Sequence, residues 1–239
     1  MGWIELIQMI PKLEGIINYF SNAPNSFGTL LAAAMFGAQA DLVVFLIKHG
    51  ASAQSHSGAK GSFFEGFNPL HFLFLLEERD INSIANLLVA HGADPNGLME
   101  SAPAISTFLV PHFPLHVCGS PLDVATRHGN FTAVKPLLDH GADPLRVCPA
   151  TSIMTIRQPL HVAVALLQFE IVGDILEHLK GGDKELLGGR SMILTWLLTG
   201  PNWKCAAIKT LEVCILHGLS IDDRDELGRT PLMWSCMRG

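Results

Sequence analysis

One short phrase recurs along this 239-residue chain, and it constrains the fold more than any other feature. A capping residue is followed by Pro-Leu and then by His or Asp, and further along the chain reads His-Gly-Ala. The most complete copy runs from Ser-Pro-Leu-Asp-Val-Ala to His-Gly-Ala-Asp over residues 120–143. Self-similarity at a spacing of about 20–50 residues is typical of solenoids, in which each repeat is one supersecondary unit.

The copies start near residues 29, 68, 120, 158 and 191, and a partial copy starts at 230. The copy at 191 is degenerate, because Ser-Met-Ile-Leu-Thr-Trp replaces the usual opening phrase. Most intervals between starts exceed the roughly 33 residues of a compact two-helix repeat. The extra residues fall largely between repeats, which predicts long inter-repeat loops.

The recurring residues predict two helices in each repeat. Side-chain oxygens that can cap the first helix are supplied by Thr29, Asn68, Ser120 and Thr230. Proline at the first helical position lacks only an N–H that has no partner there, and it occurs as Pro69, Pro121, Pro159 and Pro231. We expect one leucine of each first helix to point into the stack, namely Leu31, Leu70, Leu122, Leu160 and Leu232.

The second helix of each repeat is predicted from paired apolar residues that precede a glycine. The pairs are Leu46–Ile47, Leu87–Leu88, Leu137–Leu138, Ile175–Leu176 and Ile215–Leu216. A left-handed helix end, which favours glycine, is predicted at Gly50, Gly92, Gly141 and Gly218. Pro136 is expected in the first turn of its helix, where proline is tolerated.

Over residues 28–239 these copies resemble the ankyrin repeat. The resemblance implies an all-α solenoid of stacked helix–turn–helix units, with a partner bound across the concave face and the extended loops. Residues 1–27 are predicted to form an N-terminal helical cap, because the apolar residues between Trp3 and Phe20 follow a helical period. A separate partner-binding helix is the alternative for this segment.

Composition limits the class of partner and the compartment. The chain has 16 basic residues in no run and a net charge of −6, which argues against nucleic acid. Its five cysteines form no CxxC pair, which is typical of a reducing compartment. The N-terminus has no basic region before its apolar stretch, which is atypical of a signal peptide, and no apolar run reaches about 18 residues. We therefore expect no membrane span and a cytoplasmic or nuclear location. Only 16% of residues are charged and mean hydropathy is +0.32, so we expect either that the fold buries more than a solenoid usually does or that part of its surface contacts a partner.

The aromatic loop residues are the predicted partner-binding site. Inter-repeat loops carry function more often than the elements they connect, and the candidates are Phe63, Phe64, Phe67, Phe108, His112, Phe113, Trp196 and Trp203. The alternative for the loop 52–67 is that its aromatic side chains fold back onto the next repeat. The alternative for 95–119 is that it folds across the concave groove or forms a short hairpin.

A protein-binding module is favoured over an enzyme, because the chain contains no recognisable catalytic motif. The alternative is a small-molecule binder or a noncanonical isomerase or cyclase, with an apolar pocket under the 95–119 insertion. Its candidate residues are His112, His116 and Asp123, of which Asp123 could pair with His116 or His161. His112, His116 and Cys118 have ligand-like spacing, but no second cysteine follows, so neither a metal nor a cofactor is expected.

The sequence stops at Gly239, one helix into a repeat. Terminal repeats of solenoids need a polar outer face, yet Met233, Trp234 and Met237 lie in this last helix. We therefore expect self-association through this uncapped repeat, or a repeat fragment of a longer scaffold.

Overall fold

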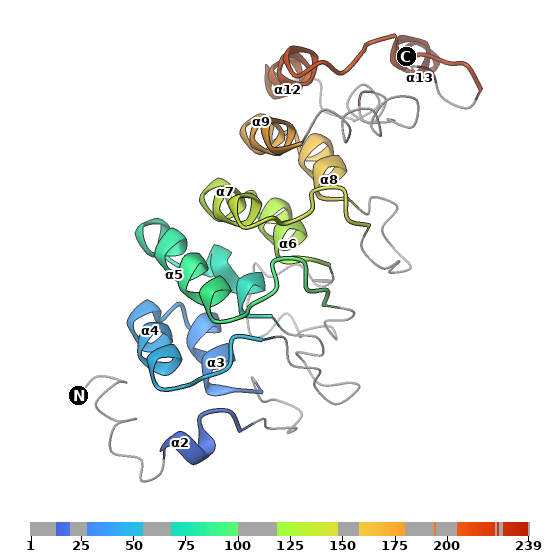
Figure 1. Ribbon diagram of the computed structural model, residues 1–239. Coiled ribbons are helices and arrows are strands. Elements are labelled where there is room, and N and C mark those ends of the chain that lie inside the picture. Colours follow the sequence, from blue (N-terminus) through green and yellow to red (C-terminus); the bar gives the residue numbers. More distant parts are fainter. Residues whose placement is uncertain are drawn as a thin grey trace. The chain divides into compact units, whose positions relative to one another are not determined.

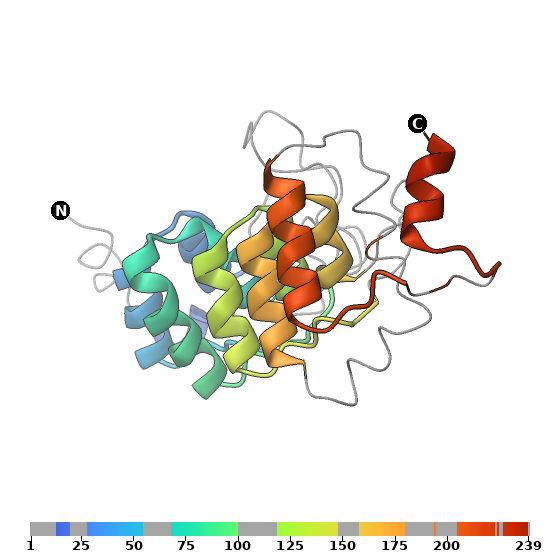
Figure 2. The ribbon, with the colours of Figure 1, turned by 90° about the horizontal axis from the view of Figure 1, so that it is seen from above.

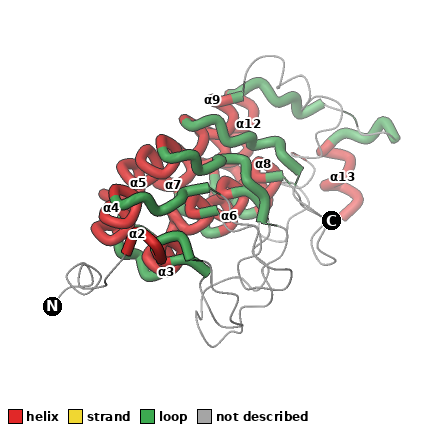
Figure 3. Tube along the Cα trace, turned by 60° about the horizontal axis from the view of Figure 1, so that its bottom comes forward, coloured by secondary structure: helices red, strands yellow, loops and turns green. Residues whose placement is uncertain are grey.

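The computed structural model describes residues 13–19, 28–54, 68–99, 119–147, 158–179, 194, 205–222, 224 and 227–238. In these ranges every regular element is a helix, apart from an isolated antiparallel bridge between Met99 and Gly119 (Figure 3). The prediction of an all-α fold is confirmed. The chain divides into two compact units, Met1–Asp143 with Val147–Thr155 and Pro144–Arg146 with Ile156–Gly239.

The first unit contains three consecutive helix pairs, preceded by the short helix α2 (Leu13–Ile16). The pairs are α3 (Leu30–Phe36) with α4 (Ala40–Lys48), the 3₁₀ helix η1 (Pro69–Leu75) with α5 (Glu78–Ala90), and α6 (Pro121–Arg127) with α7 (Phe131–Asp139). The second helices α4, α5 and α7 pack side by side, and the first helices α3, η1 and α6 form the layer beside them (Figure 1).

The second unit begins with the pair α8 (Pro159–Ala165) and α9 (Phe169–His178). Helix α12 (Cys205–Leu216) packs alongside α9 (Figure 2), and α13 (Pro231–Arg238) follows. The predicted copies at 158 and 230 therefore begin at α8 and α13. The start of the degenerate copy near 191 lies outside the described residues, except for Leu194.

The predicted helix caps are confirmed. Each capping side chain accepts a hydrogen bond from a backbone N–H of the first turn. Thr29 accepts from Ala32 at 3.1 Å, Asn68 from Leu70 at 3.0 Å, Ser120 from Asp123 at 3.2 Å and Thr230 from Met233 at 3.3 Å. The prolines open their helices as expected, at Pro69, Pro121, Pro159 and Pro231. Gly50, Gly92, Gly141 and Gly218 have φ values between +81° and +92°, so the predicted left-handed helix ends are also confirmed.

All five predicted apolar pairs lie in second helices, but the pairs in α5 and α12 are displaced by one residue relative to the terminal glycine. Counted back from the terminal glycine, the paired positions are the fourth and the third residue, which in α5 are Leu88 and Val89 and in α12 are Cys214 and Ile215. Leu216, the second residue of the predicted pair in α12, is 81% exposed. A shift of one residue turns a side chain by about 100° around the helix, so the register decides which face is covered.

The prediction for Pro136 is wrong as well. Helix α7 starts at Phe131 after the capping residue Asn130, so Pro136 is its sixth residue and lies in the second turn. Proline there cannot donate to the carbonyl of Thr132, which removes one intrahelical hydrogen bond. Pro136 is buried with Ala133 and Leu137, so it contributes to the packed face of the helix.

Leu232 does not point into the stack. It is 67% exposed, whereas its four counterparts Leu31, Leu70, Leu122 and Leu160 are at most 1% exposed. Neighbouring helices enclose the four earlier leucines, but Leu232 remains open to solvent.

The first helix of the second repeat differs from the others because the segment is shorter. Glu77 caps α5 nine residues after Asn68, whereas the two capping residues are ten apart in the pairs Thr29 and Gln39, Ser120 and Asn130, and Gln158 and Gln168. A 3₁₀ helix rises about 2.0 Å per residue against 1.5 Å in an α-helix, so a shorter segment can span a similar length.

Asparagine side chains connect the turns of successive repeats in the first unit. The Asn96 amide donates to the Gly141 carbonyl at 2.9 Å and accepts from the Asp143 N–H at 2.8 Å. Asn18 makes the same two contacts with Gly50, at 2.9 Å, and Ser52, at 2.7 Å. The described part of the N-terminal segment therefore joins the first repeat as one repeat joins the next.

Candidate functional site

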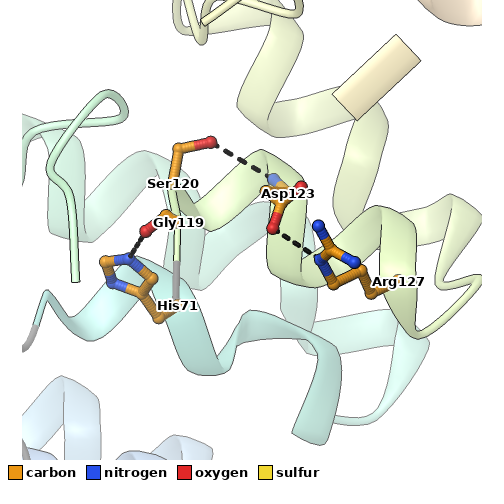
Figure 4. Close-up of polar contacts among 5 residues, drawn as sticks. All are labelled: His71, Gly119, Ser120, Asp123 and Arg127. Carbon is orange, nitrogen blue, oxygen red and sulfur yellow. Dashed lines mark hydrogen bonds and ion pairs between the residues drawn. The ribbon is translucent and has the colours of Figure 1, made fainter. Parts of the chain in front are cut away.

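A buried histidine connects the second and third repeats. His71, in η1, is 1% exposed, and its Nδ1 atom lies 2.9 Å from the carbonyl oxygen of Asn68. Its Nε2 atom lies 2.9 Å from the carbonyl oxygen of Gly119 (Figure 4). Carbonyl oxygens only accept hydrogen bonds, so a neutral ring can donate to one of them and an imidazolium to both. Burial lowers the pKa of His71, and the two carbonyl contacts oppose this shift. We assign the neutral ring near pH 7, since burial is the larger effect.

Gly119 is also one half of the bridge with Met99. Its N–H donates to the Met99 carbonyl and its carbonyl accepts the Met99 N–H, both at 3.0 Å. Met99 is 1% exposed, and Gly119 has a φ of +127°, a conformation that favours glycine. The two ends of the segment 100–118 are therefore held together, and His71 fastens them to the first-helix layer.

Asp123 lies in α6 at the position that His71 occupies in η1. Its side chain is fully buried, and its Oδ2 atom accepts from Arg127 Nε at 2.7 Å (Figure 4). The Oδ1 atom is buried without a hydrogen-bond partner in the described part of the chain. Burial raises the pKa of Asp123, and the hydrogen bond and charge of Arg127 act against that rise. The carboxylate is thus satisfied on one side only.

Helix α6 is enclosed on all sides. Residues 121–126 are all buried, and the hydroxyl of Thr126, like Asp123 Oδ1, has no hydrogen-bond partner within the described ranges. In contrast, Leu30, Ala33 and Phe36 of α3 are partly exposed. The first helix of the third repeat therefore offers a partner little surface.

Most of the predicted site residues cannot be placed. Phe63, Phe64, Phe67, Phe108, His112, Phe113, His116, Trp196 and Trp203 all lie outside the described residues. Asp123 is described, and its ion pair is with Arg127. Arg127 follows Asp123 by four residues, a spacing that favours a helical ion pair, so this partner could have been found from the sequence.

The repeat accounts for most of the described histidines. His49, His91 and His178 each place Nδ1 within 2.7–2.8 Å of the carbonyl four residues earlier, at or next to a helix end. His128 stacks on Phe74 with ring centroids 3.8 Å apart, and burial lowers its pKa. Among the described residues, no three His, Cys, Asp or Glu side chains form a group that could hold a metal ion.

Comparison with known proteins connects this geometry to a fold. No protein-family model and no curated protein matches the chain. Among solved structures, the ankyrin repeat domain of Bcl-3, described as a unique member of the IkappaB protein family, aligns with a TM-score of 0.61 and 19% identity, over 96% of this chain and 86% of that one. The human ASB11 ankyrin repeat domain aligns with a TM-score of 0.60 and 16% identity, over 97% and 84%. This chain has the ankyrin-repeat fold.

The described part of this ankyrin-repeat chain has two further features that bear on its surroundings. None of its helices combines the length and the apolar character needed to cross a membrane. The buried Cys214 and the exposed Cys236 are both free thiols. Burial raises the pKa of the Cys214 thiol to about 12, so this cysteine serves as a small apolar core residue.

Proposed function

We propose that this ankyrin-repeat chain is a protein–protein interaction module that binds its partner through the concave face and the extended loops. The main observation in support of this proposal is that the two ends of the insertion 100–118 are held in place by hydrogen bonds. Met99 and Gly119 pair through two hydrogen bonds, and the buried His71 contacts the Gly119 carbonyl. Loops that a rigid scaffold positions are the usual place for binding residues.

The proposed contact residues are the loop aromatics. They comprise Phe63, Phe64 and Phe67 before the second repeat, Phe108, His112 and Phe113 in the insertion, and Trp196 and Trp203 in the degenerate repeat. Aromatic side chains dominate the energetics of protein interfaces, because they bury a large apolar area at a small entropic cost. Since α6 is enclosed, the exposed contribution of the first-helix layer comes from its other helices, such as α3.

The partner is proposed to be a protein of the cytoplasm or nucleus. The chain carries a net charge of −6 with scattered basic residues, which does not suit a phosphate backbone. The free thiols of Cys214 and Cys236 are consistent with a reducing compartment.

The geometry around Asp123 gives no support to the small-molecule alternative. A general acid or base must reach the atom whose proton it transfers. Asp123 is fully buried, and one of its oxygens already binds Arg127. Its carboxylate is therefore not open to a substrate.

Site-specific photo-crosslinking tests the proposed binding surface. A photoreactive phenylalanine analogue is placed at Phe64 or at Phe113 in the full chain, and at the exposed Asn82 of α5 as a control. We expect the two loop positions to crosslink the same protein in cell extract and the control position not to do so.

The affinity of the identified partner then decides the proposal. We expect the triple substitution of Phe63, Phe64 and Phe67 by serine to weaken its binding by at least about ten-fold, because aromatic anchors supply much of an interface's free energy. A partner that binds the triple variant as tightly as the wild-type chain contradicts this site.

A further inference from the structure

The sequence contains a single Asn-Gly pair, formed by Asn96 and Gly97 in the turn that follows α5. Asparagine is one of the chemically labile residues of proteins. Its side-chain amide is lost when the backbone nitrogen of the next residue attacks the amide carbon, and glycine has no Cβ to hinder that attack. The sequence therefore favours this reaction at Asn96 over the other asparagines of the chain.

The reaction converts the side chain of Asn96 in two balanced steps. The Gly97 nitrogen forms a bond to Asn96 Cγ, the bond between Cγ and Nδ2 breaks, and ammonia leaves with the proton of the Gly97 nitrogen. A water molecule then opens the resulting cyclic imide. Hydrolysis at one carbonyl gives aspartate, and hydrolysis at the other gives isoaspartate, so both products carry a carboxylate in place of the amide.

In the folded chain, hydrogen bonds hold both reacting groups. The Gly97 N–H donates to the Asp94 carbonyl at 3.1 Å, which closes the turn. The Asn96 amide donates to the Gly141 carbonyl at 2.9 Å and accepts from the Asp143 N–H at 2.8 Å. Attack requires the Gly97 nitrogen to give up its proton and the amide to turn toward that nitrogen. Both changes are opposed while these hydrogen bonds persist.

We propose that Asn96 is a site of spontaneous deamidation whose rate is set by the opening of the junction between the second and third repeats, and that the product weakens this junction. The junction consists of the contacts of Asn96 with Gly141 and Asp143. Because the ammonia is lost to solvent, each chain that reacts keeps the weakened junction.

The product weakens the junction because a carboxylate has no N–H. The Gly141 carbonyl loses its donor and faces a second acceptor instead. The new negative charge also lies beside two acidic residues, since Asp94 Oδ1 accepts from the Asn96 N–H at 2.8 Å and the Asp143 N–H donates to the Asn96 side chain. Like charges at such short range repel one another.

Peptide mapping by mass spectrometry tests the first part of the proposal. The full chain is incubated at mildly alkaline pH, both folded and unfolded in urea, and the fraction of deamidated Asn96 is followed over time. We expect the reaction to be at least about ten-fold slower in the folded chain, because the hydrogen bonds of the turn and of the junction must first open.

Two glycine variants separate opening of this junction from general unfolding. Gly141 and Gly50 have φ values of +81° and +92°, and an added Cβ at either position meets no atom within 4 Å. Alanine therefore strains the backbone at both positions to a similar extent. We expect Gly141→Ala to accelerate deamidation of Asn96 in the folded chain by about three- to ten-fold. Gly50→Ala strains the carbonyl that binds Asn18 instead, and should leave the rate at Asn96 unchanged.

Amide hydrogen exchange tests the effect of the product. The variant Asn96→Asp reproduces the aspartate product, and we expect exchange of the Asp143 amide to become about three- to ten-fold faster. Asn18→Asp makes the same chemical change at the junction with the first repeat, and should leave exchange at Asp143 unchanged.

Equal rates at Asn96 in the folded and the unfolded chain overturn the proposal, because the fold then does not protect this residue. Equal acceleration by Gly141→Ala and Gly50→Ala overturns it too, since general unfolding then sets the rate. Unchanged exchange at Asp143 in Asn96→Asp shows that the product does not weaken the junction. None of these measurements uses a binding partner, so they are independent of the loop-binding proposal.

Discussion

The Nε2 atom of His71 lies 2.9 Å from the carbonyl oxygen of Gly119, 48 residues further along the chain. This contact joins two first helices and fixes the end of an insertion, so its protonation state influences both. The pKa of the buried ring lies below its ordinary value of 6.5. The unfolded chain consequently takes up a proton at a higher pH than the folded chain does.

We predict that the stability supplied by His71 is present above pH 6.5 and decreases as the pH falls below it. In this range the unfolded state binds more protons than the folded state, so the free energy of unfolding falls. Urea denaturation between pH 7.5 and 5.5 measures the slope. The variant His71→Gln is expected to be about 1–3 kcal/mol less stable at pH 7.5, because a buried hydrogen bond is lost, and to show a shallower slope.

His49→Gln is the control for this experiment. His49 is exposed, and its Nδ1 atom also lies near a backbone carbonyl, 2.8 Å from that of Phe45. We expect this variant to keep the wild-type slope. Burial also lowers the pKa values of His128 and His161, but these rings act equally in wild type and variants. If His71→Gln has the same slope as the wild type, the protonation of His71 does not control stability.

The ion pair of Asp123 and Arg127 gives a second prediction. Arg127→Leu leaves a fully buried carboxylate without its charged partner, and breaking such a pair costs about 3–5 kcal/mol. Because burial already raises the pKa of Asp123, protonation on lowering the pH removes part of this penalty. We expect the destabilisation, measured by urea denaturation, to be larger at pH 7 than at pH 5.

The double variant Asp123→Asn with Arg127→Leu separates charge from packing. With the carboxylate removed, no buried charge needs a partner, and we expect most of the lost stability to return and the pH dependence to flatten. A double variant as unstable as Arg127→Leu alone contradicts the assignment and places the cost in the packing of Arg127.

Local chemistry made the caps and helix ends predictable from the sequence. The capping contact of Ser120 involves a residue three positions away, and the positive φ of Gly141 depends on its own turn. These features need only neighbouring residues, which the sequence displays directly. Pro136 is an exception, because the start of its helix is set by the capping contact of Asn130 with Ala133, which the repeat phrase did not reveal.

Features that depend on distant residues were not predictable in this way. The exposure of Leu232 depends on what packs around it, and it differs from that of Leu122 although both follow a proline. His71 and Gly119 are 48 residues apart and an insertion lies between them, so their spacing in the sequence does not indicate that they are in contact. Asp123 was a candidate residue from the sequence, with His116 or His161 as its expected partner, but its partner Arg127 was missed although it lies on the same helix.

Asn18 provides a test of the N-terminal cap. Its side chain bonds to Gly50 and Ser52, so Asn18→Ala removes two hydrogen bonds between the segment 13–19 and the first repeat. We expect faster amide hydrogen exchange in this segment and a loss of roughly 1–2 kcal/mol in its local stability. Asn96→Ala removes the equivalent contacts between the second and third repeats and should leave exchange at residues 13–19 unchanged.

The turn between α3 and α4 contains a strained residue that glycine should relieve. Ala38 has a φ of +53°, and Gly129 takes up the same position in the third repeat with a φ of +65°. A left-handed conformation costs a residue with a Cβ about 1–2 kcal/mol in the folded state, and glycine removes this cost. Glycine also increases the entropy of the unfolded chain, which offsets part of the gain. We therefore predict that Ala38→Gly raises the free energy of unfolding by about 0.5–1 kcal/mol, measured by urea denaturation.

Ala33→Gly, within α3, is the control and should lower the free energy of unfolding by a similar amount, because glycine weakens a helix interior. If both variants are destabilised alike, Ala38 does not adopt this conformation in solution.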